Sequence, residues 1–264
     1  MLQELLICPV CGGKMTLTDR TWRCEKGHAF DVAKEGYVNL LRTNKSGDRI
    51  GDDKFSARCR RDFLNKDYYR ILAQRLAQIL EEKSGRLLDI CCGEGYYASF
   101  VAEHTGLKVY GFDIAREMVR LAAKRGKGDY FVANMAAIPV ADESFDCAIH
   151  LFAPFHEPEF YRVLKPGGLL LSVTPGSRHL YGLKEAVYDT PYLNEETPPV
   201  ARQLTFLKTE KLTGKILLES PEDIDAVFRM TPYYFHTSPK DKEKLKAFQK
   251  MESEVEFLIH FYKK

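Results

Sequence analysis

The stretch from Leu87 to Tyr97 constrains the fold more than any other part of this sequence. An apolar run that contains one acidic residue, Asp89, leads into a turn with Gly93 and Gly95. Glycines allow the backbone to turn tightly and to approach a ligand closely. A helix after such a turn points its free N–H groups at that ligand. The stretch therefore predicts a strand–loop–helix unit that holds a nucleotide-like cofactor at the edge of a parallel sheet.

Apolar runs and amphipathic segments alternate along the chain after residue 85. The apolar runs are residues 87–91, 108–112, 130–133, 147–152 and 169–174, and the amphipathic segments are 96–104, 115–125 and 158–164. This alternation predicts an α/β fold with a parallel sheet, whose ligand lies beyond the carboxyl ends of the strands. Helices are also expected over 54–65, 71–80 and 221–228, and strands over 204–206, 215–218 and 255–261.

Polar residues follow the predicted strands where a cofactor would bind. Asp113 comes after the second run, 18 residues beyond Gly95, and its carboxylate can accept hydrogen bonds from both hydroxyls of a ribose. It is equally suited to cap the next helix. Asn134 and Met135 follow the third run, where an amide and an apolar side chain can face an adenine. Their order at successive strand ends indicates a nucleoside-type cofactor.

Two cofactors compete for this site. Residues 93–98 satisfy the dinucleotide fingerprint when alanine is allowed in its third place. However, Glu94 would bring a carboxylate beside the pyrophosphate of a dinucleotide, which is electrostatically unfavourable. S-adenosylmethionine has no phosphate and carries a sulfonium and an ammonium, so Asp89 and Glu94 would favour it. The residues therefore favour the methyl donor and leave the dinucleotide as the second interpretation.

A metal site is predicted near the N-terminus, in a chain whose other cysteines are scattered. Cys8 and Cys11 are separated by two residues, and Cys24 and His28 supply a second half-site. The residues between the half-sites alternate as two short ribbon strands would. Three sulfurs and one imidazole nitrogen make a closed tetrahedral zinc site, which is structural because no position is left for water. Free thiols in loops are the alternative, and a redox pair lacks the surrounding strand–helix pattern.

The net charge of the 264 residues is +2, but the charge is unevenly distributed. Residues 34–75 hold 11 lysines and arginines against 6 acidic residues, which indicates either a phosphate-rich partner or a solvated face. On the first interpretation, RNA contacts would come from Lys34, Arg58, Arg60 and Arg61. No apolar run approaches the roughly 18 residues of a membrane span. Since the N-terminus also lacks the pattern of a signal peptide, a cytoplasmic protein is expected.

The chain divides into three predicted parts. They are a zinc-binding module over 1–40, a basic connector with entry helices over 41–85, and the cofactor-binding domain over 86–264. Residues 30–41 show no clean period and are interpreted as an ordered linker, and the polar segment 42–53 as a loop. The aromatic stretch 230–236 could stack a flipped base, although core packing is the favoured interpretation.

Several of these motifs together resemble the class I methyltransferases. They are residues 89–97, Asp113, Ile138-Pro139, Ser144-Phe145-Asp146 and Leu164-Lys165-Pro166-Gly167-Gly168. The resemblance implies a Rossmann-like sheet that binds S-adenosylmethionine. The sequence departs from the pattern at Cys91, where the turn usually has its first glycine. The backbone at Cys91 is therefore expected to be one that tolerates a side chain.

A second set of motifs is similar to the bacterial large-subunit (23S) ribosomal RNA guanine-N1 methyltransferases. The set comprises the Cys8/Cys11/Cys24/His28 knuckle, residues 33–41, the turn at 92–97, Thr174-Pro175-Gly176 and Arg178-His179-Leu180. The resemblance implies methylation of guanine N1 in a hairpin loop of that RNA, a structural zinc, and a homodimer with a basic cleft. It also implies contacts to S-adenosylmethionine from Tyr69, Gly93, Glu94 and His179.

Two other functions remain open on the sequence. One is a small-molecule methyltransferase that a zinc module supports, and the other is a zinc-ribbon RNA-binding module without turnover. The zinc knuckle followed by a basic connector favours the RNA enzyme over the small-molecule enzyme. The sequence marks no general base. His156 and Glu157 are candidates by position only, and a surface role is favoured for both.

Overall fold

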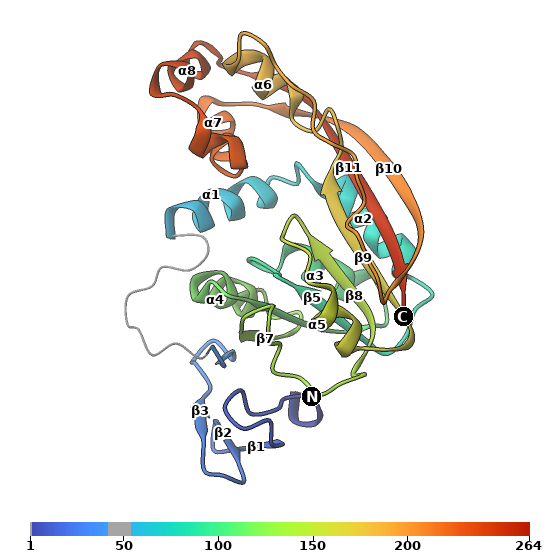
Figure 1. The fold of residues 1–264 in the computed structure, drawn as a ribbon. Coiled ribbons are helices and arrows are strands. Elements are labelled where there is room, and N and C mark those ends of the chain that lie inside the picture. Colours follow the sequence, from blue (N-terminus) through green and yellow to red (C-terminus); the bar gives the residue numbers. More distant parts are fainter. Residues whose placement is uncertain (1, 42–53) are drawn as a thin grey trace.

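The computed structural model describes residues 2–41 and 54–264 (Figure 1). The loop predicted over 42–53 lies outside the described residues. Within them, the strands form a sheet of three strands and a sheet of eight. The small sheet belongs to the N-terminal segment, drawn in blue, and the large sheet runs through the body of the molecule.

The large sheet has the strand order β10-β11-β9-β8-β5-β6-β7-β4. Its strands are β4 (Val38–Asn39), β5 (Arg86–Ile90), β6 (Lys108–Asp113), β7 (Asp129–Val132), β8 (Phe145–Leu151), β9 (Leu164–Pro175), β10 (Thr205–Leu218) and β11 (Met251–Lys263). Strands β4 to β9 are parallel, and β11 is antiparallel to both of its neighbours. The predicted α/β fold is confirmed. The strand order reverses between β5 and β8, which is where such sheets bind ligands.

Helices lie on both faces of this sheet and beyond its upper end (Figure 1). They are α1 (Lys54–Asn65), α2 (Arg70–Leu80), α3 (Tyr96–His104), α4 (Arg116–Arg125), α5 (Glu157–Val163), α6 (Tyr181–Val187), α7 (Pro221–Arg229) and α8 (Pro239–Glu243), with short 3-10 turns η1 (Leu2–Glu4), η2 (Pro232–His236) and η3 (Lys244–Ala247). Alternate residues of β5 point to opposite faces: Leu87 packs in the core with α2, α3 and α4, and Leu88 in the core with α5 and the N-terminal segment. Asp89 therefore lies on the face that α2 and α3 cover.

The N-terminal segment forms a ribbon that continues into the large sheet. Strands β1 (Met15–Thr18), β2 (Thr21–Cys24) and β3 (Ala29–Asp31) make the small antiparallel sheet, as the alternation predicts. The interpretation of 30–41 as a linker is wrong, because β3 extends into it, β4 lies within it, and β4 pairs with β7. β4 has only two residues, too few to show a strand period in the sequence. It becomes a strand because it pairs with the edge of β7.

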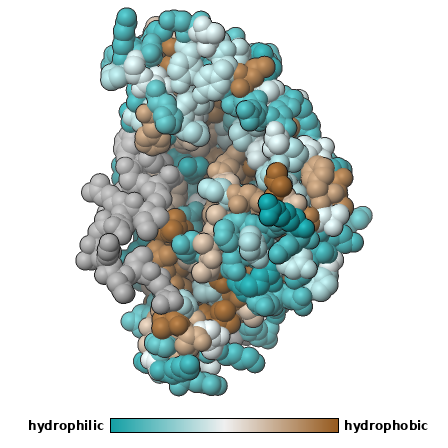
Figure 2. Space-filling model, viewed as in Figure 1, coloured by the Kyte–Doolittle hydropathy of each residue, from teal (hydrophilic) through white to brown (hydrophobic). Residues whose placement is uncertain are grey.

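The C-terminal part extends the sheet and builds a cap over its end. The two strands expected at 204–206 and 215–218 are one strand, β10, which pairs with β11 over its length. This strand is hard to recognise in the sequence because it mixes polar and apolar residues: most of its side chains are exposed, and only Ile216 and Leu218 are buried. The helix predicted at 221–228 is confirmed as α7, and the Ser220 side chain caps it by accepting a hydrogen bond from the Asp223 N–H. In Figure 2 this upper end is mostly hydrophilic, whereas apolar side chains gather lower on the same face.

Candidate cofactor and metal sites

The turn after β5 has three residues in the left-handed region, and one of them is not glycine. Cys91 has φ 59°, Gly93 φ 55° and Gly95 φ 78°. The expectation that the backbone at Cys91 tolerates a side chain is therefore wrong, because left-handed backbone disfavours any Cβ. Glycine is needed at position 95 for two reasons: its φ is positive, and a Cβ there would lie 2.9 Å from the Cβ of Ala122. The turn is thus strained where it lines a cavity.

A small cavity of about 60 Å³ lies against this turn, lined by Asp89, Cys91, Cys92, Gly93, Glu94 and Tyr97 among others. Three buried polar atoms on its walls have no hydrogen-bond partner within the described part of the chain: Asp89 Oδ2, Glu94 Oε1 and Tyr97 Oη. Burial, followed by the nearby Asp113 charge, raises the pKa of the Asp89 carboxyl well above its usual value. Buried acceptors without partners are costly. These two carboxylate oxygens and the phenol oxygen fit a cationic ligand that would donate the missing hydrogen bonds.

Only one of the two carboxylate oxygens of Glu94 is hydrogen-bonded to a described residue. Its Oε2 accepts a hydrogen bond from Arg125 at 2.5 Å, whereas Oε1 has no partner among the described residues. Burial raises the pKa of Glu94, and the Arg125 charge opposes that rise. The ion pair therefore holds Glu94 in place and leaves one oxygen for a ligand.

The Asp113 carboxylate stabilises the turn by accepting two backbone hydrogen bonds. Its Oδ2 accepts the Gly93 N–H at 3.0 Å, and its Oδ1 accepts the Ala115 N–H at 2.8 Å, just before α4. A carboxylate oxygen can accept more than one hydrogen bond, so accepting these N–H groups is compatible with a ribose contact as well. Both roles weighed for Asp113 are thus compatible with its position.

The two residues expected to face an adenine are placed differently. Met135 lies at the turn, with its Sδ 3.8 Å from the Cys91 Sγ. Asn134 is exposed, accepts the Ala136 N–H through its Oδ1, and lines a separate surface pocket beside Cys8. The structure therefore brings Met135, but not the Asn134 amide, to the turn at Cys91.

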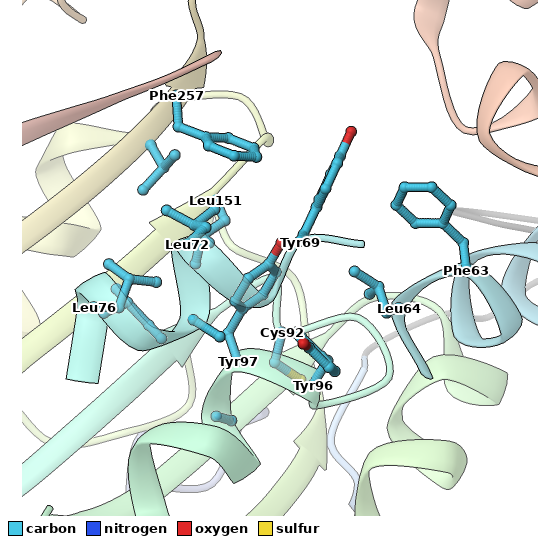
Figure 3. Packing of buried hydrophobic residues seen from close by; sticks show 14 of the residues in the cluster. Phe63, Leu64, Tyr69, Leu72, Leu76, Cys92, Tyr96, Tyr97, Leu151 and Phe257 are labelled. Carbon is cyan, nitrogen blue, oxygen red and sulfur yellow. The ribbon is translucent and has the colours of Figure 1, made fainter. Parts of the chain in front are cut away.

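Tyr69, which lines the small cavity, is hydrogen-bonded to His179. Tyr69 Oη lies 2.9 Å from His179 Nε2, and His179 Nδ1 accepts the backbone N–H of Glu256 at 3.2 Å. Burial lowers the pKa of His179 to about 4, so the ring is neutral near pH 7. Because Nδ1 is an acceptor, we assign the ring hydrogen to Nε2, which then donates a hydrogen bond to the Tyr69 oxygen. The hydroxyl hydrogen of Tyr69 is then available to a ligand. Figure 3 shows Tyr69 among side chains from several elements, including Tyr97 and Phe257.

A larger cavity of about 410 Å³ adjoins the small one. Four residues line both cavities and so form the boundary between them: Arg60, Tyr69, Phe152 and Met230. The remaining walls come mainly from the end of β9, from residues 179–180 just before α6, from Tyr192 and Asn194, and from residues 231–236 around η2. The volume is within the range usual for ligand pockets.

Three residues that form or support the larger cavity, Phe152, Tyr192 and Lys184, were not among the residues expected at a ligand site. Phe152 gives no signal in the sequence, because its left-handed backbone, φ 55°, is visible only in the structure. Tyr192 lies in a segment without regular structure. Lys184 is fully buried and holds this segment by donating to Tyr192 O and Asn194 Oδ1. A lysine in a short helix gives no sign that it is buried. No sequence pattern therefore identifies Tyr192 or Lys184 as part of this cavity or its support.

The predicted metal ligands converge. One ligand atom from each of Cys8, Cys11, Cys24 and His28 lies within 4.8 Å of the others. The closest pairs are Cys24 Sγ with His28 Nδ1 at 3.3 Å and Cys8 Sγ with His28 Nδ1 at 3.5 Å. Two turns present these atoms, closed by the Gly12 N–H on Cys8 O and the Gly27 N–H on Cys24 O. Three thiolates and an imidazole at this spacing fit a tetrahedral zinc ion.

The four basic residues considered for RNA do not form one group. Lys34 and Arg58 are exposed, and Arg61 is paired with its neighbour Asp62 at 2.7 Å. Arg60 instead lines both cavities, and its side chain passes about 4.0 Å from a Cβ placed on Gly93. Arg60 is thus positioned at the ligand site rather than on an outer surface.

The two positional candidates for a general base lie before and in the first turn of α5. Glu157 accepts the backbone N–H groups of Arg202, Gln203 and Leu204. These bonds lower the pKa of Glu157 against the effect of burial, and they give it an anchoring role. His156 directly precedes the helix, and it lines neither of the two cavities.

Comparison with known proteins places the chain among RNA methyltransferases. A zinc-ribbon family model described as RlmA, N-terminal, matches residues 6–46, and a methyltransferase-domain model matches residues 87–168. The 23S rRNA (guanine(748)-N(1))-methyltransferase of Streptomyces fradiae is 32% identical over 89% of this chain and 88% of its own length. This chain belongs to that family of 23S rRNA guanine-N1 methyltransferases.

Further relatives of the same description support this membership. A putative 23S rRNA (guanine-N(1)-)-methyltransferase from Micromonospora griseorubida is 31% identical over 89% of this chain and 88% of its own. YxjB of Bacillus subtilis, with the same putative description, is 28% identical over 90% and 89%. The family, the methyltransferase fold and the zinc ribbon expected from the sequence are thereby confirmed. No helix in the described ranges is long and apolar enough to cross a membrane.

Proposed function

We propose that this chain transfers a methyl group from S-adenosylmethionine to N1 of a guanine in a hairpin loop of 23S ribosomal RNA. The observation that carries this proposal is the identity of 32% over nearly the full length of a 23S rRNA guanine-N1 methyltransferase. A small-molecule methyltransferase would share the sheet but not the zinc ribbon that precedes it.

The small cavity is the proposed site of the methionyl part of the cofactor. Asp89, Glu94 and Tyr97 offer unpartnered polar atoms there, which suits the ammonium and sulfonium charges. Gly93 and Gly95 allow close backbone approach, and the Tyr69 hydroxyl donates from a position that His179 fixes. Asp113 is the proposed ribose contact, and Met135 the apolar neighbour of the adenine. Asn134 would reach that base only after its side chain leaves Ala136.

The reaction requires little covalent chemistry from the protein. Bound S-adenosylmethionine supplies an activated methyl group, and its sulfur leaves with the C–S electron pair as a neutral thioether. Guanine N1 provides the electron pair for the new N–C bond and gives up its proton. The residues on the boundary of the two cavities therefore act by holding N1 in line with the methyl group and by excluding water.

An imidazole is the proposed acceptor of the N1 proton. Two histidines, His179 and His236, line the larger cavity. Both nitrogens of His179 are engaged, by Tyr69 and by the Glu256 N–H. His236 is exposed at the end of η2, and it is our candidate for the general base.

The proposal also covers the zinc ligands, assembly and location. We assign zinc to Cys8, Cys11, Cys24 and His28 as a structural ion, because four protein ligands leave no open position. Arg60 is the proposed RNA contact nearest to the reacting groups, with Lys34, Arg58 and Arg61 farther out. The division at residues 40 and 85, a homodimer and a cytoplasmic location remain predictions, which light scattering and fractionation can test.

The decisive experiment uses unmodified 23S RNA and S-adenosylmethionine labelled in its methyl group. Label should enter the RNA, and reverse transcription should stop at one guanine, because N1 methylation blocks its pairing edge. Asp89→Asn should lower incorporation sharply. If the protein binds S-adenosylmethionine but transfers no label to RNA, the RNA-binding module without turnover is the better description.

A further inference from the structure

We propose that the larger cavity receives the extruded guanine and that the Phe152 ring is the surface on which this base stacks. The inference rests on the proposed function, because it specifies where the acceptor base binds. A base that reacts at N1 must leave its pairing partner, and extruded bases are held between aromatic or apolar side chains. The cavity is large enough for such a ligand.

The backbone of Phe152 is held in a conformation that a bulky residue rarely adopts. Its φ is 55°, and its own N–H donates to Val173 O at 3.0 Å, which fixes the residue to β9 at the end of β8. The ring is nevertheless 39% exposed. Strain of this kind persists only where the surroundings impose it, and it is concentrated at ligand sites. The strain therefore presents an aromatic face to the cavity instead of burying it.

The ring stands on the boundary between the two cavities. Phe152 lines both of them, and its centroid lies 6.4 Å from that of Tyr69 and 6.1 Å from that of His179. A base stacked on this ring would have one edge toward the cavity that we assign to the methyl donor. Stacking at this position would thus bring the acceptor nitrogen toward the methyl group.

Two other lining residues supply a second aromatic ring and a hydroxyl without a hydrogen-bond partner among the described residues. Tyr192 is 51% exposed, and the buried ammonium of Lys184 fixes it by donating to Tyr192 O at 3.0 Å. Tyr233 is only 9% exposed, and its hydroxyl has no hydrogen-bond partner within the described ranges. An orphaned hydroxyl on a cavity wall is suited to the polar edge of a base.

The charge of the cavity also favours a base carried by RNA over a cationic or neutral small molecule. Arg60 lies on the boundary, and no aspartate or glutamate lines the cavity among the described residues. An aromatic surface beside an arginine is the combination that binds an unpaired base together with its phosphate.

The test compares Phe152→Leu with a matched control, Phe206→Leu. Phe206 is 46% exposed and lies on β10, away from both cavities. Phe152→Leu should lower kcat/KM for 23S RNA by about 5- to 100-fold, the loss expected for one base–aromatic stack. The dissociation constant for S-adenosylmethionine should change less than threefold. Phe152→Trp should restore most of the activity, and Phe206→Leu should behave as wild type.

A structural role for Phe152 predicts that its variants lose stability and RNA activity together. If Phe152 acts by stacking, Phe152→Gly should lower kcat/KM for RNA while Tm stays close to that of wild type, because relief of the left-handed backbone offsets the lost ring contacts with Tyr69, His179 and Phe257. With 2-aminopurine in place of the target guanine, the bound RNA should fluoresce more with Phe152→Leu than with wild type, because the extruded base is no longer stacked.

The failures of the two proposals are distinguishable. If wild type methylates RNA but Phe152→Leu keeps kcat/KM within twofold, the stacking role is overturned and the function stands. If Phe152→Leu instead weakens S-adenosylmethionine as strongly as RNA, Phe152 belongs to the cofactor site and the inference is also overturned. If wild type itself transfers no methyl group to RNA, the proposed function fails first.

Discussion

Tyr69 Oη lies 2.9 Å from His179 Nε2, although the two residues are 110 positions apart in the sequence. The Glu256 N–H fixes the tautomer of His179, so the imidazole donates and the phenol accepts. This relationship joins α2 to the segment before α6, and it directs the phenol hydrogen into the ligand site. The sequence could supply the two residues only through a family resemblance, because no local pattern links them.

Removing the Tyr69 hydroxyl should weaken cofactor binding. Tyr69→Phe keeps the ring but leaves the buried His179 N–H without an acceptor, a loss of about 1–3 kcal/mol. We expect a lower Tm and an affinity for S-adenosylmethionine reduced about tenfold, measured by calorimetry. Tyr188→Phe, which removes a hydroxyl bonded to Thr237, should leave that affinity unchanged. Equal affinities for Tyr69→Phe and wild type would contradict the tautomer assignment.

Stability should fall as the pH is lowered from about 7 toward 4. Burial lowers the pKa values of His150 and His179 to about 4 from their ordinary value of 6.5. Between these limits the unfolded chain binds more protons, so acid favours unfolding. Urea denaturation at several pH values should show this decline. His150→Gln, which cannot titrate, should reduce its slope, and an identical slope would contradict the assignment to His150.

Loss of one zinc ligand should release the metal. Cys24→Ala leaves three ligands, so we expect the zinc content, measured by atomic emission, to fall from one per chain toward zero. The N-terminal ribbon should then become sensitive to protease, because metal-binding energy contributes to its folding. Cys147→Ala, a buried cysteine in β8, should keep its zinc. Full occupancy in Cys24→Ala would mean that the four-ligand site is wrong.

The buried ammonium of Lys184 should strengthen RNA binding. Lys184→Met removes the bonds to Tyr192 and Asn194, so hydrogen exchange over residues 188–203 should accelerate. KM for RNA should rise severalfold while S-adenosylmethionine binding is retained. Lys215→Met is the control, because Lys215 pairs with Glu252 on the surface. Unchanged exchange in Lys184→Met would show that this segment is held by other contacts.

His236→Ala tests the proposed general base. A lost base should lower kcat by about 100-fold, with S-adenosylmethionine affinity unchanged. The remaining activity should rise with pH, because the N1 proton of guanine is then lost without help from the protein. His104→Ala, an exposed imidazole in α3, should have no effect. A kcat within twofold of wild type would exclude His236 from this role.

Residues 86–175 were predictable because each strand is a continuous apolar run and each helix has a clear period. Helix α3 was predicted with its observed bounds. The ribbon ligands were also predictable, since their chemistry depends on spacing alone. The placement of Arg60, Phe152 and Lys184 was not, because it depends on contacts between distant segments and on backbone strain. Strands β4 and β10 were hidden for a related reason: their pairing is decided by neighbouring strands, not by their own composition.

The pairing of β4 with β7 has a consequence for metal dependence. The Leu40 N–H donates to Val132 O in β7, and the Ala141 N–H, in the segment before β8, donates to Leu5 O, so the N-terminal segment is bonded to the methyltransferase part on both sides of its metal site. Cys8 and Trp22 pack in the same apolar core as Phe131 and Phe145. Zinc affinity and the unfolding free energy of the sheet edge are therefore linked quantities. Within this one core, the concentration of free zinc helps to set the fraction of chains in which the edge of the methyltransferase sheet is folded.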